Sequence, residues 1–198
     1  MAPPLASAGR MPALKGPPEL KHLDRVLVSP TAIKRRIATM AEQLNADYAK
    51  KDMMVVAIVN GALIFTADLL RALRSPLRLD CLRASSYHDG TKAVGEPRII
   101  DQMKLDVRGH HVLLVDDILD TGKTLAAVAG LIKMKGAASV RTCVLLDKKA
   151  RRTVPFEADY VGFEIPNEFV VGYGLDFNEQ YRNLPCIGVL KPKYYGGK

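Results

Sequence analysis

Apolar side chains recur along this chain with two different periods, one typical of helices and the other of buried strands. Over residues 30–50 they follow one another at spacings of three and four, which predicts an amphipathic helix. Ser29 and Pro30 suit the start of that helix, as an N-cap and a first helical residue. Residues 55–59 and 112–115 are short, wholly apolar runs, which are typical of strands buried on both faces.

The remaining pattern adds two helices and several strands. Helices are predicted over residues 62–73 and 125–134, and Gly136 closes the second as a C-cap. Further strands are predicted from residue 77 toward 86 and over 139–146, 160–165, 170–173 and 187–190. In the helix over 30–50, the basic run Lys34, Arg35 and Arg36 is expected to face water.

Strands that alternate with helices through the first 146 residues predict an α/β fold with a mostly parallel sheet. Such sheets bind ligands at the carboxyl ends of their strands. That rule selects Asn60-Gly61, residues 116–124 and the chain from Asp147 onward. Residues 87–97 show no periodicity, so they are either a passive connection or a loop that covers a site.

The composition is typical of one globular domain, with 48% hydrophobic and 25% charged residues among 198. We expect a disordered lead-in over residues 1–20, a single domain over 21–190 and a basic tail over 191–198. The lead-in lacks a continuous apolar core, so a signal peptide is not expected and a targeting role is the minor alternative. No run approaches the roughly 18 apolar residues of a membrane helix, so no membrane partner is expected.

The net charge and the cysteine positions limit the binding partners and the cellular compartment that we expect. The net charge of +8 is concentrated partly in the tail, and the mildly basic remainder suits a phosphate-rich small substrate as well as a polynucleotide. Aromatic residues are only 6% and tryptophan is absent, so nucleic acid is not an expected partner. Cys81, Cys143 and Cys186 form no paired motif, which favours a reducing compartment, and we expect a cytoplasmic protein.

The segment with the clearest chemistry is DDILDTGKT, over residues 116–124. It follows the apolar run that ends at Val115, and its Thr-Gly-Lys-Thr opens the next helix. Unpaired amides at a helix start bind phosphate, and Gly122 lets the backbone come close. Carboxylates accept hydrogen bonds from vicinal hydroxyls. One end of the segment therefore suits a phosphate and the other a sugar diol, as in a ribose 5-phosphate.

Two other interpretations of this segment need comparison with its residues. A P-loop requires glycine five residues before Gly122, and that position is Asp117, whose carboxylate would repel a triphosphate. The P-loop interpretation therefore fails. Acidic residues that merely cap a helix are the other interpretation. One aspartate fits that role, but three carboxylates at the mouth of a parallel sheet fit it less well.

The stretch VLLVDDILDTGKTL resembles the phosphoribosyl pyrophosphate motif of type I phosphoribosyltransferases. Residues 159–182 (DYVGFEIPNEFVVGYGLDFNEQYR), with Lys148 ahead of them, are similar to the base-binding half of hypoxanthine-guanine phosphoribosyltransferases. The resemblance extends over about residues 55–189. It implies the type I phosphoribosyltransferase fold, a twisted, mostly parallel sheet flanked by helices, with a small hood built from the terminal segments.

The resemblance also implies a reaction and its residues. Ribose 5-phosphate would pass from phosphoribosyl pyrophosphate to N9 of hypoxanthine or guanine, with Mg²⁺, and Asp120 would act as the acid/base. The phosphoribosyl group would be bound by Asp116, Asp117, Ile118, Leu119, Asp120, Thr121, Gly122, Lys123 and Thr124. Pyrophosphate would be bound by Asn60, Gly61, Ser86, Tyr87 and Arg182. The purine would be bound by Lys148, Glu168, Phe169, Val170 and Asp176, and Mg²⁺ by Asp176, Asp116 and Asp117.

Asn60 departs from the family's pattern, because many members have lysine there. The family's cis peptide is expected at Asn60-Gly61. Two alternatives stay open: a xanthine-preferring enzyme, and an RNA-binding regulator of the pyrimidine-operon type, which shares the phosphate motif. Family members are commonly dimers or tetramers, so a homodimer or homotetramer is expected.

Overall fold

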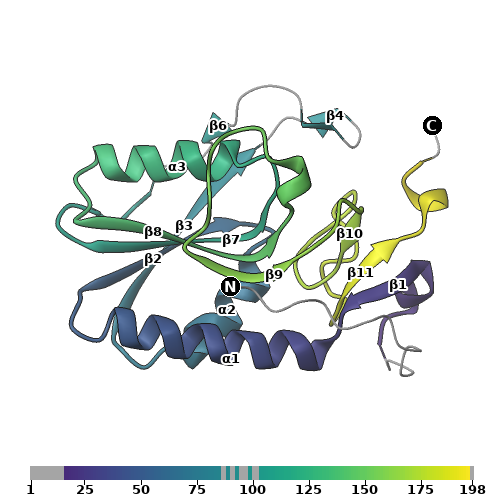
Figure 1. The fold of residues 1–198 in the computed structure, drawn as a ribbon, viewed down its shortest axis with the longest axis horizontal. Coiled ribbons are helices and arrows are strands. Elements are labelled where there is room, and N and C mark those ends of the chain that lie inside the picture. The colour runs from purple at the N-terminus through teal and green to yellow at the C-terminus, as the bar shows by residue number, and fades with distance from the viewer. Residues whose placement is uncertain (1–15, 86–87, 90–91, 94–97, 100–102, 197–198) are drawn as a thin grey trace.

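A twisted six-stranded sheet forms the centre of the molecule in the computed structural model, which describes residues 16–85, 88–89, 92–93, 98–99 and 103–196 (Figure 1). The strand order is β6-β3-β2-β7-β8-β9. Five strands run parallel: β2 (Met53–Val59), β3 (Leu77–Ser85), β7 (His111–Leu119), β8 (Ser139–Asp147) and β9 (Tyr160–Glu164). The two-residue β6 (Arg98–Ile99) is antiparallel to β3. The predicted α/β fold with a mostly parallel sheet is therefore confirmed.

Helices cover both faces of this sheet, as the wholly apolar strands require. α1 (Pro30–Asp47) and α2 (Leu63–Ala72) pack on one face, and α3 (Lys123–Met134) packs on the other (Figure 1). Successive residues of β7 serve the two faces in turn, since Leu113 and Val115 join the core under α1 and α2, whereas Val112 and Leu114 join the core under α3. Ser29 caps α1 as predicted, accepting from the Ala32 amide at 3.2 Å.

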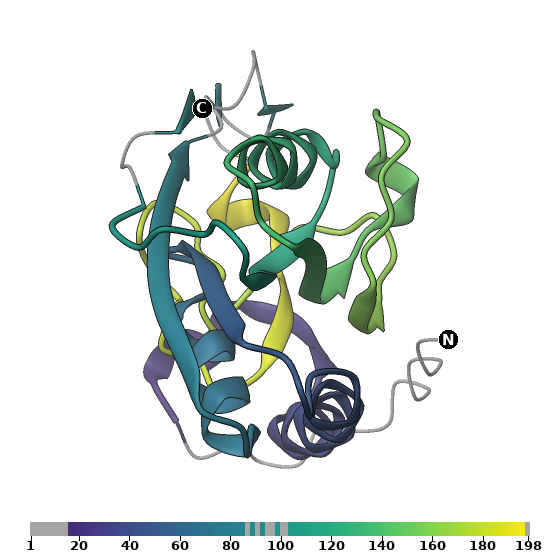
Figure 2. The same cartoon turned by 90° about the vertical axis from the view of Figure 1, so that its left-hand side faces the viewer.

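A second, three-stranded sheet joins the two terminal regions of the chain. β11 (Ile187–Leu190) lies between β1 (Leu23–Val28) and β10 (Val170–Val171), antiparallel to both. Figure 2 shows β1, in purple, beside the yellow β11. This sheet has its own apolar cluster, which includes Leu23 and Leu190. It is the hood that the resemblance implies.

Several predicted boundaries were wrong. β7 does not end at Val115 but continues to Leu119, because β8 also continues and pairs Leu119 with Asp147. β10 ends at Val171 because Gly172 and Tyr173 have positive φ values of 100° and 53°, which interrupt an extended strand. β1 was not predicted at all.

Two residues of the predicted helices were misplaced. Met134 was assigned to the apolar face of α3 but is 81% exposed, because α3 ends there. Arg36 was expected to face water, but its guanidinium donates to the carbonyls of Gly162 at 2.9 Å and Val161 at 2.6 Å, which attaches α1 to β9. Burial of the Arg36 guanidinium lowers its pKa.

The segments at the two ends contribute to the hood. Of the lead-in expected over residues 1–20, residues 1–15 lie outside the described part, and its last residues belong to the 3-10 helix η1 (Pro18–His22). In the tail, η3 (Pro192–Tyr194) places Tyr194 on the His22 ring, with centroids 4.1 Å apart. Among the helices described, none has the length and apolarity to cross a membrane.

The loop expected over residues 87–97 lies partly outside the described residues. Within it the short strands β4 (His88–Asp89) and β5 (Lys92–Ala93) pair antiparallel. The short 3-10 helix η2 (Lys149–Arg151) follows β8. All three cysteines are free, with Cys143 and Cys186 buried and Cys81 exposed.

Candidate active site

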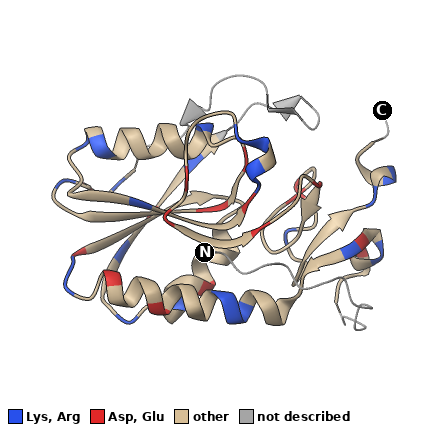
Figure 3. Ribbon diagram, in the orientation of Figure 1, with Lys and Arg blue, Asp and Glu red and all other residues tan. Residues whose placement is uncertain are grey.

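The carboxyl ends of the central strands open into a pocket of about 540 Å³, whose wall also includes the loop that follows β10 in the hood. Most of the predicted site residues meet there. They are Asn60, Gly61, Asp116, Asp117, Ile118, Leu119, Asp120, Thr121, Gly122, Thr124, Lys148, Phe169, Val170, Asp176 and Arg182. Figure 3 shows acidic positions toward the end of β7 and basic positions in the segment that follows β8.

Two of the predicted residues that the structure describes are not in this wall. Lys123 is exposed on the first turn of α3, and the Glu168 side chain points to Arg25 of β1. Ser86 and Tyr87 lie outside the described residues.

Seven residues of the pocket wall were not predicted as site residues: Ile58, Val59, Arg83, Ala84, Leu125, Leu175 and Glu179. Arg83 stands near the carboxyl end of β3. The rule that selected Asn60-Gly61 and the segment after β7 applies equally to β3, so the position of Arg83 in its strand was the available signal.

Asp116 and Asp117 are adjacent carboxylates near the end of β7. The Asp116 side chain is buried and accepts a hydrogen bond from the Asp117 amide at 3.0 Å. Burial raises the pKa of Asp116 well above its ordinary value, and the neighbouring Asp117 charge adds to the rise. Burial also raises the pKa of Asp117. Hydrogen-bond donors or a cation placed close to these two buried carboxylates would stabilise their charged forms.

The turn after β2 packs directly against these carboxylates. A Cβ on Gly61 would overlap the carboxylate of Asp117, so the turn can approach this closely only with glycine. The peptide bond between Val59 and Asn60 is cis. The expected position, Asn60-Gly61, was therefore one bond too late.

The turn between β7 and α3 supplies the amides of Asp120, Thr121 and Gly122. Gly122 is the N-cap of α3, with a φ of 85°. A Cβ at this position would lie 2.9 Å from Val154 Cγ2 and 3.1 Å from Arg152 Cδ. Glycine is therefore required both by the backbone conformation and by the segment that packs behind the turn.

Asp120 sits at the start of this turn and is partly exposed. Its carboxylate receives a hydrogen bond from Arg151 Nε at 3.1 Å, and the two side chains are 34% and 32% exposed. Arg151 was not predicted from the sequence, where it is one of four basic residues among the five that follow β8.

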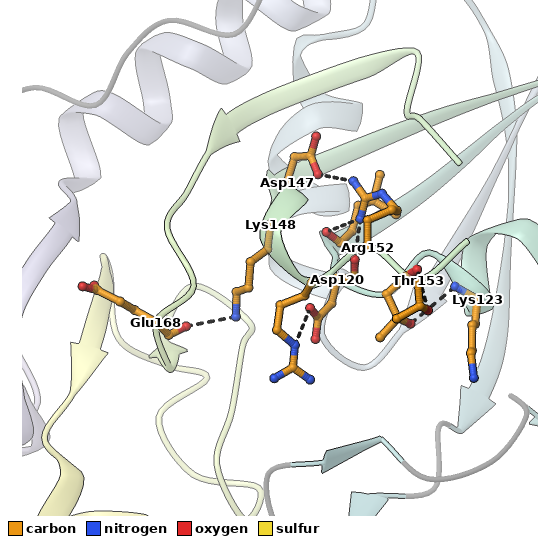
Figure 4. A network of polar contacts seen from close by, with 10 residues as sticks. Asp120, Lys123, Asp147, Lys148, Arg152, Thr153 and Glu168 are labelled. Atoms are coloured by element: carbon orange, nitrogen blue, oxygen red, sulfur yellow. Dashed lines mark hydrogen bonds and ion pairs between the residues drawn. The ribbon is translucent and has the colours of Figure 1, made fainter. Parts of the chain in front are cut away.

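Lys148, at the end of β8, is a buried cation at the pocket wall. Burial lowers the pKa of its ammonium group, while nearby Asp120 opposes that shift. Its Nζ donates to the carbonyl of Glu168 at 2.9 Å (Figure 4). The carboxylate of Glu168 pairs with Arg25, so the segment that precedes Phe169 is attached both to β8 and to the hood.

The Phe169 ring forms an aromatic part of the wall. Tyr195 from the tail stacks on it, with ring centroids 4.7 Å apart and planes at 23°, and Phe177 meets it edge-on at 5.6 Å. Phe169 lines the pocket and Tyr195 does not, so Tyr195 supports the ring from outside the pocket.

Asp176 and Arg182 lie together in the loop that follows β10. Arg182 Nη2 is 2.9 Å from Asp176 Oδ1, and the Glu179 amide donates to Asp176 Oδ2 at 2.9 Å. Arg182 also donates to the Gly174 carbonyl at 2.8 Å. Asp176, which stands between Leu175 and Phe177 in the sequence, thus pairs with an arginine.

The carboxylates of the pocket suit a cation that arrives with a ligand. Within the described residues, no group of three or more His, Cys, Asp or Glu side chains could hold a metal ion alone. Mg²⁺ commonly uses one or two carboxylates together with substrate phosphates and water. The buried pair Asp116 and Asp117, with its raised pKa values, would gain from such an ion.

Together these groups form one site with three chemical regions. Free amides at the start of α3 suit a phosphate, the adjacent carboxylates suit hydroxyls or a cation, and Lys148 with Phe169 suits a flat ring that carries an acceptor. Arg182 adds a guanidinium group to the wall of the same pocket.

Comparison with known proteins agrees with this arrangement. Residues 27–178 match the phosphoribosyl transferase domain family. The hypoxanthine-guanine phosphoribosyltransferase of Streptococcus pneumoniae is 46% identical over 173 residues, which cover 87% of this chain and 96% of that protein. The bifunctional protein TilS/HprT of Listeria innocua is also 46% identical over 173 residues and 87% of this chain, but the chain spans only 27% of its length.

Among solved structures, a hypoxanthine phosphoribosyltransferase from Staphylococcus aureus superposes with a TM-score of 0.88 at 39% identity. The match covers 93% of this chain and all of that one. The chain therefore belongs to the phosphoribosyltransferase family, and within it to the hypoxanthine-guanine phosphoribosyltransferase branch.

Proposed function

We propose that this protein is a purine salvage enzyme that transfers ribose 5-phosphate from phosphoribosyl pyrophosphate to N9 of hypoxanthine or guanine. The products would be IMP or GMP and pyrophosphate. The observation that carries the proposal is a single pocket, which combines the amide and carboxylate turn after β7 with Lys148 and Phe169. One half suits a phosphorylated sugar, and the other suits a 6-oxopurine.

The phosphoribosyl group would lie along residues 116–124. Amides from Asp120 to Thr124 would bind the 5-phosphate, since they stand at the start of α3, where backbone N–H groups carry partial positive charge. Asp116 and Asp117 would accept hydrogen bonds from the ribose hydroxyls.

The purine would lie between Phe169 and the end of β8. Lys148 Nζ would leave the Glu168 carbonyl and donate to the 6-oxo oxygen. A 6-amino group offers no acceptor there, so it would leave a buried cation without a partner, which selects against adenine. The backbone of Val170 would contact the edge of the ring.

In the reaction, a bond forms between C1 of the sugar and purine N9 while the bond from C1 to pyrophosphate breaks. Positive charge builds at C1, and the buried carboxylates of Asp116 and Asp117 would stabilise it. Asp120, close to N7, would accept the proton that the base loses, after release from Arg151. Transfer to the base rather than to water requires a closed site.

Pyrophosphate would be bound by Arg182 and by the backbone of the Asn60-Gly61 turn, with Ser86 and Tyr87 as further contacts. Mg²⁺ supplied with the substrate would neutralise charge on the leaving group, and Asp176, Asp116 and Asp117 would hold it. Asn60 cannot provide the positive charge of the lysine found there in many relatives. The binding of pyrophosphate would therefore depend more on the charge of Arg182. Arg83 is a second cation in the same wall.

The proposal includes a cytoplasmic location, which the three free cysteines favour, and assembly as a homodimer or homotetramer. The partners would be phosphoribosyl pyrophosphate and 6-oxopurine bases, without nucleic acid or membrane.

The test is an assay of pyrophosphate release with phosphoribosyl pyrophosphate, Mg²⁺ and each of hypoxanthine, guanine, xanthine, adenine and uracil. We expect release with hypoxanthine and guanine and none with adenine or uracil. Release with xanthine alone would favour the xanthine-preferring alternative. Inactivity with all three oxopurines would overturn the proposal. Tight RNA binding that weakens steeply with salt in a filter assay would then favour the regulator.

A further inference from the structure

The turn that would bind the 5-phosphate is attached on its outer side to the segment that follows β8. Three successive carbonyls of the turn, those of Leu119, Asp120 and Thr121, all accept hydrogen bonds from this segment. The Leu119 carbonyl accepts from the Lys148 amide at 2.9 Å and from Arg152 Nη1 at 3.1 Å. The Asp120 carbonyl also accepts from Arg152 Nη1 (Figure 4). The Thr121 carbonyl accepts from the Thr153 amide at 3.0 Å.

Planar peptide geometry converts these bonds into an orientation of the amides. In a trans peptide, the carbonyl of one residue and the N–H of the next point in opposite directions. Fixing the carbonyls of Leu119, Asp120 and Thr121 toward the segment therefore turns the N–H groups of Asp120, Thr121 and Gly122 the other way. Those three residues line the pocket, and none of their amides has a hydrogen-bond partner among the residues described.

Arg152 is the only side chain among the described residues that bonds two of these carbonyls. It does so from outside, because it is not part of the pocket wall. Its other Nη donates to Asp147, and the two side chains are 12% and 1% exposed. The planar, forked guanidinium can reach both carbonyls and the carboxylate at once, which a lysine ammonium cannot do in the same geometry.

A buried ion pair is poor evidence for stability, because desolvation offsets the attraction between its charges. Its retention therefore needs another reason. A cation on the carbonyl side of a peptide also polarises it and strengthens the N–H on the opposite side as a donor. Both effects, orientation and polarisation, would make the amides of Asp120, Thr121 and Gly122 better hydrogen-bond donors to an anion in the pocket.

We propose that Arg152, held by Asp147, is a positioning residue for the substrate's 5-phosphate, acting through the peptide groups that it fixes. This inference rests on the proposed function, since it concerns the phosphate end of the same pocket. It requires that loss of Arg152 weaken the recognition of the phosphate selectively, leaving recognition of the nucleoside part intact.

The test compares the binding of IMP and inosine by calorimetry, because the two ligands differ only in the phosphate. The ratio of their dissociation constants measures what the phosphate contributes. In Arg152→Gln we expect that ratio to fall by at least about tenfold, equivalent to about 1.4 kcal/mol. Arg152→Lys should recover thermal stability but only part of the ratio, and Asp147→Asn should lower the ratio in the same direction.

The control is Lys149→Gln, which removes a positive charge from the same segment. Lys149 pairs with Glu164 outside the pocket, so its loss should leave the ratio as in the wild type. An unchanged ratio in Arg152→Gln, with both ligands weakened equally, would show that Arg152 has only a structural role. If wild-type protein binds IMP no more tightly than inosine, the proposed function itself fails.

Discussion

Asp116 and Asp117 are adjacent carboxylates whose burial disfavours their charged forms. Both carboxylates stand at the buried end of a strand, and burial raises both pKa values. No basic side chain among the described residues pairs with Asp116. Such an arrangement reduces the stability of the free protein, but it leaves two carboxylates ready for hydroxyls and a cation. Strain of this kind is typical of functional sites.

Asp116→Asn should therefore raise the melting temperature of the ligand-free protein at pH 7, measured calorimetrically in EDTA. Because the folded-state pKa of Asp116 lies above its unfolded value, the native state holds the extra proton, and wild-type stability falls as pH rises above about 4. The difference between variant and wild type should thus be small below about pH 4 and grow toward neutral pH. Each ~1 kcal/mol gained corresponds to about 2–4 °C. A variant less stable than wild type at pH 7 would contradict this account.

Asp120 is partly exposed and balanced by Arg151, which makes it available for proton transfer. Asp120→Asn preserves the shape of the side chain but removes the base, so we expect turnover to fall by about 10²–10⁴-fold, with much smaller changes in substrate affinity. Stopped-flow or steady-state rates with hypoxanthine would measure this.

Arg151→Ala is the matched control for Asp120→Asn, because it breaks the same ion pair and leaves the carboxylate in place. Partly exposed pairs contribute about 0.2–1 kcal/mol, so turnover in the control should change by less than about fivefold. Wild-type turnover in Asp120→Asn would show that another group transfers the proton.

At the level of elements, the tail after β11 supports the purine side of the pocket. Tyr195 stacks on the outer face of Phe169, and the tail is fixed at its start by the Lys191 amide, which donates to the His22 carbonyl at 3.1 Å. The lysine-rich segment after β11 thus includes a packed aromatic contact. Stacked aromatic pairs contribute about 0.5–1.5 kcal/mol beyond the area they bury.

Tyr195→Ala should consequently raise the KM for hypoxanthine by about 2- to 10-fold, because Phe169 loses the ring that holds it in place. The KM for phosphoribosyl pyrophosphate should stay within about twofold, since Tyr195 is outside the pocket wall and stacks on Phe169. Tyr195→Phe keeps the stacking and should behave as wild type. Equal effects on both substrates would indicate a general loss of folding.

The elements themselves were predictable to the degree that each followed from local sequence. The strands around Val56 and Leu114 were predicted because they are continuous apolar runs. β1 mixes charged and apolar residues, and it becomes a strand only through pairing with the distant β11. The end of β10 depends on backbone conformations at Gly172 and Tyr173 that no period records.

The site residues that could be predicted were likewise those defined by local sequence. The segment over residues 116–124 could be identified from the sequence, because its carboxylates and the amides that suit a phosphate are contiguous. Arg152 could not, since it lies in a basic run that looks solvated, and its burial depends on Asp147 and on carbonyls some thirty residues earlier. The contact of Arg25 with Glu168 could not be predicted either, because the folded hood brings these two distant residues together.

On the scale of the whole molecule, the pocket is shared between two sheets. The main sheet supplies Asp116 to Gly122 and Lys148, and the hood supplies the loop from Phe169 to Arg182. A substrate that contacts both parts should therefore stabilise the folded state as a unit, by mass action on the native form.

Phosphoribosyl pyrophosphate with Mg²⁺, at about 100 times its dissociation constant, should stabilise the protein by about 2.7 kcal/mol. The melting temperature should then rise by roughly 5–10 °C. EDTA should abolish most of that rise, because the carboxylates of Asp116 and Asp117 would otherwise face the substrate's phosphates without a cation. Differential scanning fluorimetry measures both values. A full shift in EDTA would mean that binding does not need the metal ion.

The pairing of β1 with β11 has a consequence for synthesis on the ribosome. Every strand of the main sheet lies between residues 53 and 164, so that sheet can close while later residues are still being added. β1 leaves the ribosome first among the described strands, yet among them it pairs only with β11, about 160 residues later in the sequence. Until β11 has been synthesised, a nascent chain thus carries an unpaired β1 and lacks the hood side of the pocket.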